Sequence, residues 1–497
     1  MLNINNNSSR LKKEILVRIA RLQFEGKLVD GVHNITRELA PPNGNPIRCC
    51  VYHDREIIRH RVIARLGCGL EDYDDEKRLS EYAEEALNRE KPVGPVLTVL
   101  DLACNSCVRS HFMVTNACQA CLARPCLVNC GKKAIAIKDG RACIDSEKCV
   151  SCGLCMQNCP YHAIIKIPVP CEEACPVGAI SKGENGREHI DYDKCISCGN
   201  CMRECPFGAM IDKSQLVDVI KQMMAGKKVV AMYAPAAAAQ FRIEPGRLEG
   251  ALLAAGFSNV VEVALGADIT ATKEAAEFAE RMAKGEKMMT TSCCPAYVRA
   301  VRQHVPELVS CVSDTRTPMH YAAEIAKKEF PDCVTVFIGP CLAKRREGMD
   351  DDLVDYVISI EELGALFVAR GIDVTKAAIA PGNKIPTPEG RNFAKSGGVA
   401  QAVRAFLKDA SILKEAVIDG LDKAGMKRLA EFGKINAGTL PRTDDTPNLI
   451  EVMACQGGCI AGPSVITNQK VALAQLAKYA EFGARLPAQM DDKGGKT

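Results

Sequence analysis

Two cysteine runs near the middle of the chain have a spacing that suits iron–sulfur chemistry. Both fit the pattern C-x2-C-x2-C-x3-C-P. The first run is Cys149, Cys152, Cys155 and Cys159, and the second is Cys195, Cys198, Cys201 and Cys205. In this pattern three thiolates hold one 4Fe–4S cube and the fourth thiolate holds a neighbouring cube. A structural zinc site needs only pairs of C-x2-C, so zinc does not account for two complete runs.

Such runs are typical of bacterial ferredoxins, and each one needs a partner run. Cys118, Cys121, Cys126 and Cys130 form the partner of the first run. The partner of the second run is split between Cys104 with Cys107 and Cys171 with Cys175. One two-cluster ferredoxin is therefore predicted to be inserted within a loop of another. Cys143 is left over.

The crossed pattern predicts four accessory cubes. The outer unit would hold one cube on Cys104, Cys107, Cys171 and Cys205, and one on Cys175, Cys195, Cys198 and Cys201. The inner unit would hold one on Cys118, Cys121, Cys126 and Cys159, and one on Cys130, Cys149, Cys152 and Cys155. A row of cubes carries single electrons and holds no substrate, so we expect the chemistry downstream.

Three downstream segments each place cysteines directly after an apolar strand. They are "TSCCPAY" with Cys293 and Cys294, "GPCLAKRRE" with Cys341, and "EVMACQGGCIAGP" with Cys455 and Cys459. Ligands at the ends of different strands converge on one crevice in α/β proteins. One cysteine of the first segment and the three others give four thiolates, which suits a further cube. One thiol of the adjacent pair then stays free beside the metal.

These three segments resemble the signature loops of the iron-only (FeFe) hydrogenases, which are close to TSCCPxW, MPCxxKxxE and ExMACxxGCxxG. The resemblance covers essentially residues 101–497. It implies an H-cluster, which is a 4Fe–4S cube joined through one cysteine to a two-iron unit with CO, cyanide and a dithiolate bridge that carries an amine. By position, the cube ligands are Cys294, Cys341, Cys455 and Cys459, and Cys459 is the bridge.

The resemblance also implies a proton path. Cys293 is the free thiol, and a thiol suits a relay because it is a weak acid that both gives and takes a proton. Glu274 and Glu277 lie three residues apart on one helix face, and Ser313 matches the serine between them. Taken alone, the two glutamates would indicate no more than a solvated helix face.

Further residues match the surroundings of the two-iron unit. Lys344 matches a lysine that binds a cyanide ligand, and a buried cation is favourable beside an anionic cluster. Met453, Phe393, Ala234 and Pro235 match apolar residues around the same unit, although each could be ordinary core.

Several positions depart from the family pattern. Tyr297 stands where Trp is usual, Gly339 stands in place of Met, and Ala236 stands in place of Ser. Thr317-Pro318-Met319 replaces Ser-Pro-Gln. These changes resemble a divergent branch of the family called group B, in which the packing around the two-iron unit differs.

The elements that position these residues fall into three regions. Residues 1–100 are predicted to be helical and of unknown role, with Ser9 as a helix N-cap and with Cys49, Cys50 and Cys68 as structural residues. Residues 101–212 form the ferredoxin-like domain, and residues 227–497 alternate apolar strands with helices, which predicts a two-lobed α/β H-cluster domain. The expected fold is α+β and multidomain.

The composition of the chain limits which partners and which cellular compartment we expect. A net charge of +3 demands no nucleic acid, and the longest apolar run, near 229–239, is too short to span a membrane. No secretory signal is evident. Most of the 27 cysteines have metal-ligand spacings instead of forming a small disulfide framework, which favours a reducing, cytoplasmic compartment.

The main hypothesis is a hydrogenase that catalyses 2 H⁺ + 2 e⁻ ⇌ H₂. Its electrons would come from a ferredoxin or flavodoxin, and maturation proteins would insert the two-iron unit. Two alternatives stay open. One is a hydrogen or redox sensor of the same fold, and the other is a non-catalytic iron–sulfur electron-transfer or assembly protein.

Overall fold

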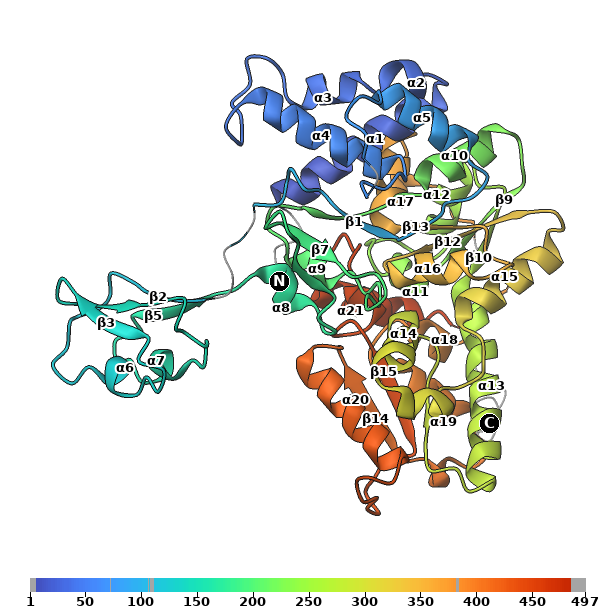
Figure 1. Ribbon diagram of the computed structural model, residues 1–497. Coiled ribbons are helices and arrows are strands. Elements are labelled where there is room, and N and C mark those ends of the chain that lie inside the picture. Colours follow the sequence, from blue (N-terminus) through green and yellow to red (C-terminus); the bar gives the residue numbers. More distant parts are fainter. Residues whose placement is uncertain (1–5, 72, 106, 108–110, 381–383, 484–497) are drawn as a thin grey trace.

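The protein folds as an α+β multidomain structure in a computed structural model (Figure 1). The structure describes residues 6–71, 73–105, 107, 111–380 and 384–483. The N-terminal helices cover one end of a large body, the two parallel sheets form its interior, and a small lobe projects from one side.

The described residues between 6 and 88 are mainly helical, as predicted. The helices are α1 (Asn7–Phe24), α2 (Leu28–Gly31), α3 (Asn34–Leu39), α4 (Val51–Arg65) and α5 (Leu79–Asn88). The prediction that Ser9 caps the first helix is wrong. Asn6 is the N-cap, because its backbone is extended and its side-chain oxygen accepts a 2.9 Å hydrogen bond from the Ser9 N–H.

Helix α1 is part of the main hydrophobic core. Leu16 and Ala20 on α1 are fully buried and pack in one cluster with Val229 and Ile338, which lie on central strands of the larger sheet. The N-terminal region is therefore continuous with the body of the protein.

The ferredoxin region consists of one unit inserted into another. In the outer unit, β1 (Leu97–Val99) pairs with β8 (Met210–Asp212) and β6 (Ile180–Lys182) pairs with β7 (Glu188–Ile190), both antiparallel. Its short helices are α8 (Pro170–Ala174) and α9 (Asn200–Glu204). The predicted nesting is confirmed in the backbone, because the inner unit starts and ends between two strands of the outer one.

The inner unit is the projecting lobe of Figure 1. Its strands pair antiparallel, β2 (His111–Val114) with β5 (Ile164–Ile167) and β3 (Ile135–Lys138) with β4 (Arg141–Ile144). Its helices are α6 (Pro125–Val128) and α7 (Leu154–Gln157). We call residues 111–167 the peripheral lobe.

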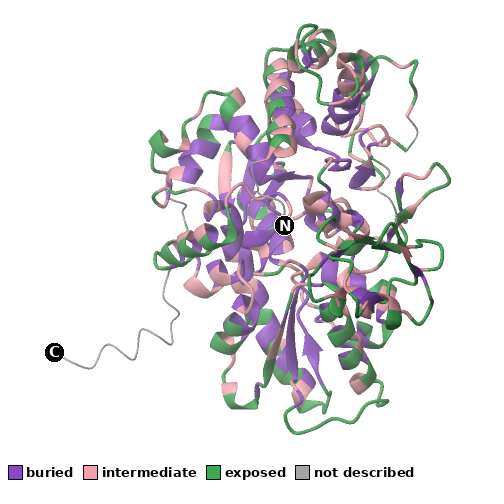
Figure 2. Ribbon diagram, turned by 90° about the vertical axis from the view of Figure 1, so that its left-hand side faces the viewer, coloured by how far each residue is buried: buried purple, intermediate pink, exposed green. Residues whose placement is uncertain are grey.

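Two parallel sheets form the C-terminal region. The first has the order β10 (Asn259–Glu262), β9 (Val229–Tyr233), β12 (Val334–Gly339) and β13 (Tyr356–Ser359). The second has the order β11 (Met289–Thr290), β15 (Leu449–Met453) and β14 (Glu415–Asp419). Figure 2 shows most of these strands buried beneath helices with exposed outer faces, whereas the edge strand β14 is partly exposed.

The covering helices surround both sheets. They are α10 (Leu216–Met224), α11 (Pro235–Ala238), α12 (Arg247–Ala255), α13 (Val263–Ala283), α14 (Pro295–His304), α15 (Pro318–Glu329), α16 (Ala343–Met349), α17 (Ile360–Ala369), α18 (Pro388–Asn392), α19 (Gly398–Phe406), α20 (Lys423–Asn436) and α21 (Gln469–Ala480). Short 3-10 turns are η1 (Pro306–Cys311), η2 (Val374–Lys376), η3 (Ala410–Ile412) and η4 (Cys459–Ala461). Over the described ranges, none of the helices has the length and apolar character needed to cross a lipid bilayer.

Candidate active site

The three cysteine loops follow strands of the two parallel sheets. Cys293 and Cys294 come after β11, and Cys455 comes after β15. These two strands are parallel neighbours, with Thr290 in register with Ile450, so their loops leave the same edge of the sheet. Cys341 follows β12 of the other sheet.

The structure brings the four predicted cube ligands together. Cys294 and Cys341 pack in one hydrophobic cluster. Burial and the neighbouring thiols of Cys341 and Cys294 together raise the pKa of Cys459 to about 12. The pKa of Cys455 lies well above its ordinary value because of burial and the same two thiols. Thiols from three separate loops thus share one place, as a four-thiolate ligand set requires.

The two adjacent thiols have different surroundings. Burial raises the pKa of Cys293 far above its ordinary value, and the nearest carboxylates, Glu274 and Glu451, add to the effect. Lys344 acts on both thiols, and no carboxylate is among the main influences on Cys294. The two thiols therefore differ in the carboxylates close to them.

Glu274 is the buried centre of the predicted proton path. Its Oε1 accepts a 3.1 Å hydrogen bond from the Ser292 N–H, and the Ser292 hydroxyl lies 3.3 Å from the same oxygen. Its Oε2 has no hydrogen-bond partner among the described residues. Burial raises the pKa of Glu274 to about 7, so near neutral pH this carboxyl is present in both protonation states.

The path continues through Ser313 to Glu277. The Ser313 hydroxyl donates a 2.6 Å hydrogen bond to Glu277 Oε2 and lies close enough to Glu274 to lower the pKa of that carboxyl. Glu277 also accepts hydrogen bonds from the Asp314 N–H and the Thr315 hydroxyl, at 2.9 and 2.8 Å. Although burial raises the pKa of Glu277, these bonds lower it below its ordinary value.

Glu277 marks the outer end of the path. It forms a 2.7 Å ion pair with Arg281, and both side chains line a surface cavity of about 560 Å³ together with Asp314. The Asp314 side chain is 94% exposed, so the surroundings of Glu277 reach solvent. Ser313 thus lies between the buried carboxyl of Glu274 and a carboxyl that borders the surface.

Sequence reasoning missed four side chains in this part of the site. Ser292 holds Glu274, Thr315 and Arg281 hold Glu277, and Glu451 accepts 2.8 Å hydrogen bonds from the backbone N–H groups of Gly397 and Ala400. Ser292 directly precedes the paired cysteines in the sequence, so its position could have identified it as a residue of the site. Arg281 lies four residues after Glu277 on α13, so the i,i+4 spacing was also a signal. Thr315 and Glu451 act across different elements, and no local pattern in the sequence identifies them.

Lys344 supplies a buried cation beside the thiols. Only 8% of the residue is exposed, and its Nζ lies 2.8 Å from Glu347 Oε2. The Thr317 hydroxyl donates to the other oxygen of Glu347, so a position that departs from the family pattern helps to hold the partner of this lysine. The Nζ has no properly oriented hydrogen bond among the described residues, which fits a cation that is available to an anionic ligand.

Apolar side chains wall the site on the side of Cys293. Met453 and Phe393 pack in one cluster with Cys293 and Cys294, and Ala236 packs in another with Cys459. Ala234 is the N-cap of α11, and Pro235 is its first residue. Of the predicted apolar residues, Met453 and Phe393 therefore pack directly against the thiols, whereas Ala234 packs in a separate cluster.

The contacts of Tyr297 and Gly339 explain why these residues fit at two positions that differ from the family pattern. Tyr297 is fully buried, and its hydroxyl donates a 2.6 Å hydrogen bond to Thr290 Oγ1 at the end of β11. A Cβ atom at Gly339 would lie only 2.6 Å from the Phe337 ring, so the residue at this strand end has to be small.

The ferredoxin region also fits its predicted clusters. Backbone N–H groups four residues further along the chain donate to the sulfur atoms of Cys130, Cys159 and Cys175, at 3.3, 3.4 and 3.1 Å. An almost entirely apolar cavity of about 250 Å³ in the peripheral lobe is lined by the four cysteines assigned to one cube, namely Cys130, Cys149, Cys152 and Cys155. N–H···S bonds and apolar walls are the usual environment of such clusters.

Electrostatic neighbours agree with the crossed pairing. Burial raises the pKa of Cys171 to about 12, and the thiols of Cys205 and Cys107 add to this effect. Burial likewise raises the pKa of Cys198 to about 12, with contributions from Cys195 and Cys175. Within the described ranges, no three His, Cys, Asp or Glu side chains are arranged to hold a single metal ion.

The outer ferredoxin unit lies directly against the candidate site. Gly199, beside Cys198, has a φ of 78°, and a Cβ atom there would lie 2.8 Å from the Pro463 ring. Arg299 on α14 donates a 3.2 Å hydrogen bond to the carbonyl oxygen of Cys195. This cluster loop therefore contacts both α14 and the loop that follows Cys459.

The sequence of this chain is similar to those of known iron-only hydrogenases. Residues 227–463 match the family model of the iron only hydrogenase large subunit, C-terminal domain. The chain is 31% identical over 378 residues to the periplasmic [Fe] hydrogenase large subunit of Nitratidesulfovibrio vulgaris, covering 64% of this chain and 85% of that protein. The chain belongs to the iron-only hydrogenase family.

Other matches cover separate parts of the chain. Residues 142–165 and 188–211 match the 4Fe-4S binding domain. The NADP-reducing hydrogenase subunit HndD of Solidesulfovibrio fructosivorans is 30% identical over 264 residues, which are 44% of this chain and 45% of that subunit. The cytosolic Fe-S cluster assembly factor NAR1 of Kluyveromyces lactis is 22% identical over 276 residues, which are 42% of this chain and 59% of that factor. The proteins that the chain is similar to are thus named for different roles.

Proposed function

We propose that this member of the iron-only hydrogenase family is a hydrogenase that catalyses 2 H⁺ + 2 e⁻ ⇌ H₂. The observation that supports the proposal is that Glu274 influences Cys293, that Ser313 influences Glu274 and binds Glu277, and that Glu277 lines a surface cavity. A protein that only stores or passes on a cluster needs thiolates but has no use for a buried proton route.

The thiolates of Cys294, Cys341, Cys455 and Cys459 would hold the cube of an H-cluster, with Cys459 as the bridge to the two-iron unit. When bound, this group supplies the redox chemistry at which protons and electrons combine. Lys344 would pair with a cyanide ligand, because it is a buried cation without a properly oriented hydrogen bond. Met453, Phe393, Ala234 and Pro235 would exclude water from the two-iron unit.

The protein's own groups would move the protons. The Cys293 thiol stays protonated at neutral pH because its pKa is raised. It can therefore give a proton to the site and regain one from Glu274, whose pKa of about 7 allows transfer in either direction. Ser313 can pass a proton between the two glutamates, and the lowered pKa of Glu277 suits a group that exchanges protons with solvent.

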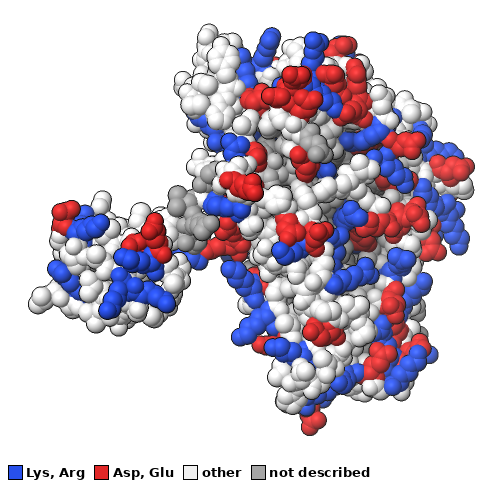
Figure 3. Space-filling view, viewed as in Figure 1, with Lys and Arg blue, Asp and Glu red and all other residues white. Residues whose placement is uncertain are grey.

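Electrons would reach the site through four accessory cubes in residues 101–212, while residues 227–497 form the catalytic domain and residues 1–100 pack beside both. We assign electron entry to the peripheral lobe. This lobe carries seven Lys and Arg residues against three Asp and Glu residues, and on its visible face blue is more extensive than red (Figure 3). An acidic carrier such as a ferredoxin or flavodoxin would match that charge.

Two expectations about the cell accompany this proposal. Maturation proteins would have to build and insert the two-iron unit. A cytoplasmic location would keep the cysteines reduced, although the Nitratidesulfovibrio vulgaris relative is named as periplasmic.

Cluster assembly is the competing function, because the NAR1 factor is among the relatives. The complete third loop with Cys459 and the buried Lys344 favour a site for a two-iron unit over a cube alone. A sensor of the same fold is the other alternative, and the presence of Cys293, Glu274, Ser313 and Glu277 favours catalysis over it.

Hydrogen evolution tests the proposal. The full chain would be matured anaerobically with the two-iron unit and supplied with reduced methyl viologen. We expect activity in the wild type and its collapse in Cys293→Ala. Cys143→Ala is the matched control, because Cys143 is exposed and outside every cluster motif.

The infrared spectrum separates the remaining outcomes. CO and cyanide bands without hydrogen evolution would favour the sensor. Absence of those bands from a protein with a filled cube would favour assembly or electron transfer.

A further inference from the structure

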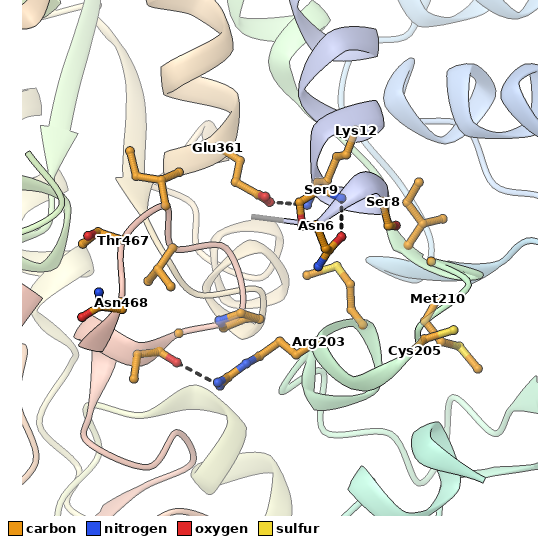
Figure 4. A pocket seen from close by; sticks show the side chains of 18 of the residues that line it. Asn6, Ser8, Ser9, Lys12, Arg203, Cys205, Met210, Glu361, Thr467 and Asn468 are labelled. Carbon is orange, nitrogen blue, oxygen red and sulfur yellow. Dashed lines mark hydrogen bonds and ion pairs between the residues drawn. The ribbon is translucent and has the colours of Figure 1, made fainter. Parts of the chain in front are cut away.

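A cavity of about 390 Å³ lies where the N-terminal region meets the ferredoxin and catalytic regions (Figure 4). Its wall is formed by the start of α1, by the segment from Met202 to Ile211 and by the loop that follows η4. Ser8 of α1 and the cluster ligand Cys205 both line it. The N-terminal region therefore directly borders one accessory cluster.

Most buried cations in this place have a carboxylate partner. Asp212 at the end of β8 is fully buried and forms ion pairs with Arg65, Lys12 and Arg345, at 2.9, 3.1 and 2.9 Å. Lys12 is also paired with Glu361 across the cavity (Figure 4). Pairing of this kind offsets the cost of removing a charge from water.

Arg61 on α4 differs from these neighbours. It is only 6% exposed, and its guanidinium donates 2.9 Å hydrogen bonds to the carbonyl oxygens of Phe207 and Gly208. Within the described part of the chain it forms no ion pair with a carboxylate, and its Nε has no hydrogen-bond partner. A buried cation without a nearby anion is unfavourable, so this site calls for a negative charge.

The accessory cube at Cys205 supplies that charge. Four thiolates make a 4Fe–4S cube an anion, and reduction adds one more negative charge. The two carbonyl groups that bind Arg61 belong to the loop of Cys205, because the Gly208 N–H donates a 3.1 Å hydrogen bond to the Cys205 carbonyl oxygen. From the other side, Arg48 donates a 2.9 Å hydrogen bond to the carbonyl oxygen of Ala103, next to the ligand Cys104.

We infer that the N-terminal region is an electrostatic cover for the cube on Cys104, Cys107, Cys171 and Cys205, and that Arg61 is the positioned counter-charge that raises its reduction potential. Net charge and solvent exposure are two of the properties that set such potentials. The inference gives residues 1–100 a role, and it rests on the cluster and not on hydrogen catalysis.

A redox titration followed by electron paramagnetic resonance tests the inference. The full chain would be reconstituted with its cubes but without the two-iron unit. In Arg61→Gln we expect one cluster to become harder to reduce, by at least about tenfold in the reduced-to-oxidised ratio, which is 59 mV for a one-electron couple. The other clusters should not move, and Arg61→Lys should shift the same signal less.

Two further variants assign the signal and control for the substitution. The shifted signal should be absent or altered in Cys205→Ser. Arg59→Gln is the matched control, because Arg59 lies on the same helix, is half-buried and donates to the Lys77 carbonyl oxygen instead of a cluster loop. Its potentials should equal those of the wild type.

Ser8→Asp keeps the test decisive even where Arg61→Gln does not fold. A Cβ atom at Gly208 would lie 2.1 Å from Ser8 Oγ and 3.1 Å from Arg61 Nη1, so Ser8 and Arg61 flank the same point. An aspartate there would neutralise Arg61 without removing it, and the first turn of a helix favours a carboxylate. We expect the potential of the same cluster to become more negative.

Unchanged potentials in Ser8→Asp, with full iron content, would overturn the inference. It would also be overturned if inorganic phosphate bound the wild type but not Arg61→Gln while the potentials of both stayed equal. That result would make a soluble anion the counter-charge.

Discussion

Replacing Glu274 with glutamine tests whether the buried carboxyl carries protons. Burial places the pKa of this group at about 7, so near neutral pH it gives and takes protons with equal ease. Glutamine has the same shape and keeps the oxygen that accepts from Ser292, but it cannot exchange a proton. Positioned acid–base groups contribute about 10²- to 10⁴-fold to rates, so we expect Glu274→Gln to lower kcat for hydrogen evolution at least about a hundredfold.

Although Glu274→Gln should lower the rate, it should make the folded protein more stable than the wild type near neutral pH. In the folded protein the pKa of Glu274 is about 7, against an ordinary value of 4.5. The folded state therefore binds this proton more tightly, and the wild type loses stability as the pH rises from 4.5 to 7. At 1.36 kcal/mol per pKa unit the loss is about 3 kcal/mol, and the variant does not suffer it.

Urea denaturation of the cluster-free protein across this pH range measures the difference. We expect the free energy of unfolding of the variant, relative to the wild type, to rise by about 3 kcal/mol between pH 4.5 and 7.5. Glu280→Gln on the same helix is the control, because Glu280 is exposed and pairs only with Lys284 among the described residues. Near-normal kcat in Glu274→Gln, or a pH-independent difference in stability, would refute this role.

Three other substitutions follow from the packing. Tyr297→Phe leaves Thr290 Oγ1 without its 2.6 Å partner and should lower the free energy of unfolding by about 1–3 kcal/mol, while an unchanged urea midpoint would contradict this contact. Arg391→Met breaks a buried pair with Glu262 at 2.8 and 2.9 Å, and the unpaired carboxylate should cost about 3–5 kcal/mol. Adding Glu262→Gln should recover part of that loss in thermal unfolding, and no recovery would argue against the pair. Gly199→Ala places a methyl group 2.8 Å from a proline ring and should slow electron transfer from the accessory clusters to the site in stopped-flow reduction, with an unchanged rate as the contrary result.

Much of the architecture could be predicted because the relevant signals are local in the chain. The apolar runs around Val229 and Val334 are strands, and both are central in the larger sheet. Cysteine spacing predicted the nested ferredoxin units, since cluster geometry fixes how far apart ligands lie in sequence. The cap of α1 was misplaced by a few residues because Asn6 and Ser9 are both good caps, and backbone conformation decides between them.

The side chains that escaped prediction act across elements. Arg281 on α13 reaches Asp314 in the loop after η1, and Glu451 on β15 holds the start of α19. Single charged residues in a helix or strand carry no periodic signal, so their partners emerge only from packing. The placement of Arg61 against the Cys205 loop is of the same kind, since 147 residues separate Arg61 from Gly208.

The most direct test of the central claim is the exchange of D₂ with solvent protons by the fully matured chain. It requires neither an electron carrier nor the accessory clusters, so it isolates the chemistry of the candidate active site. We predict that HD forms in the wild type and that its rate falls sharply in Cys293→Ala. No HD from a wild-type protein whose infrared spectrum shows bound CO and cyanide would contradict the assignment of this chain as a hydrogenase.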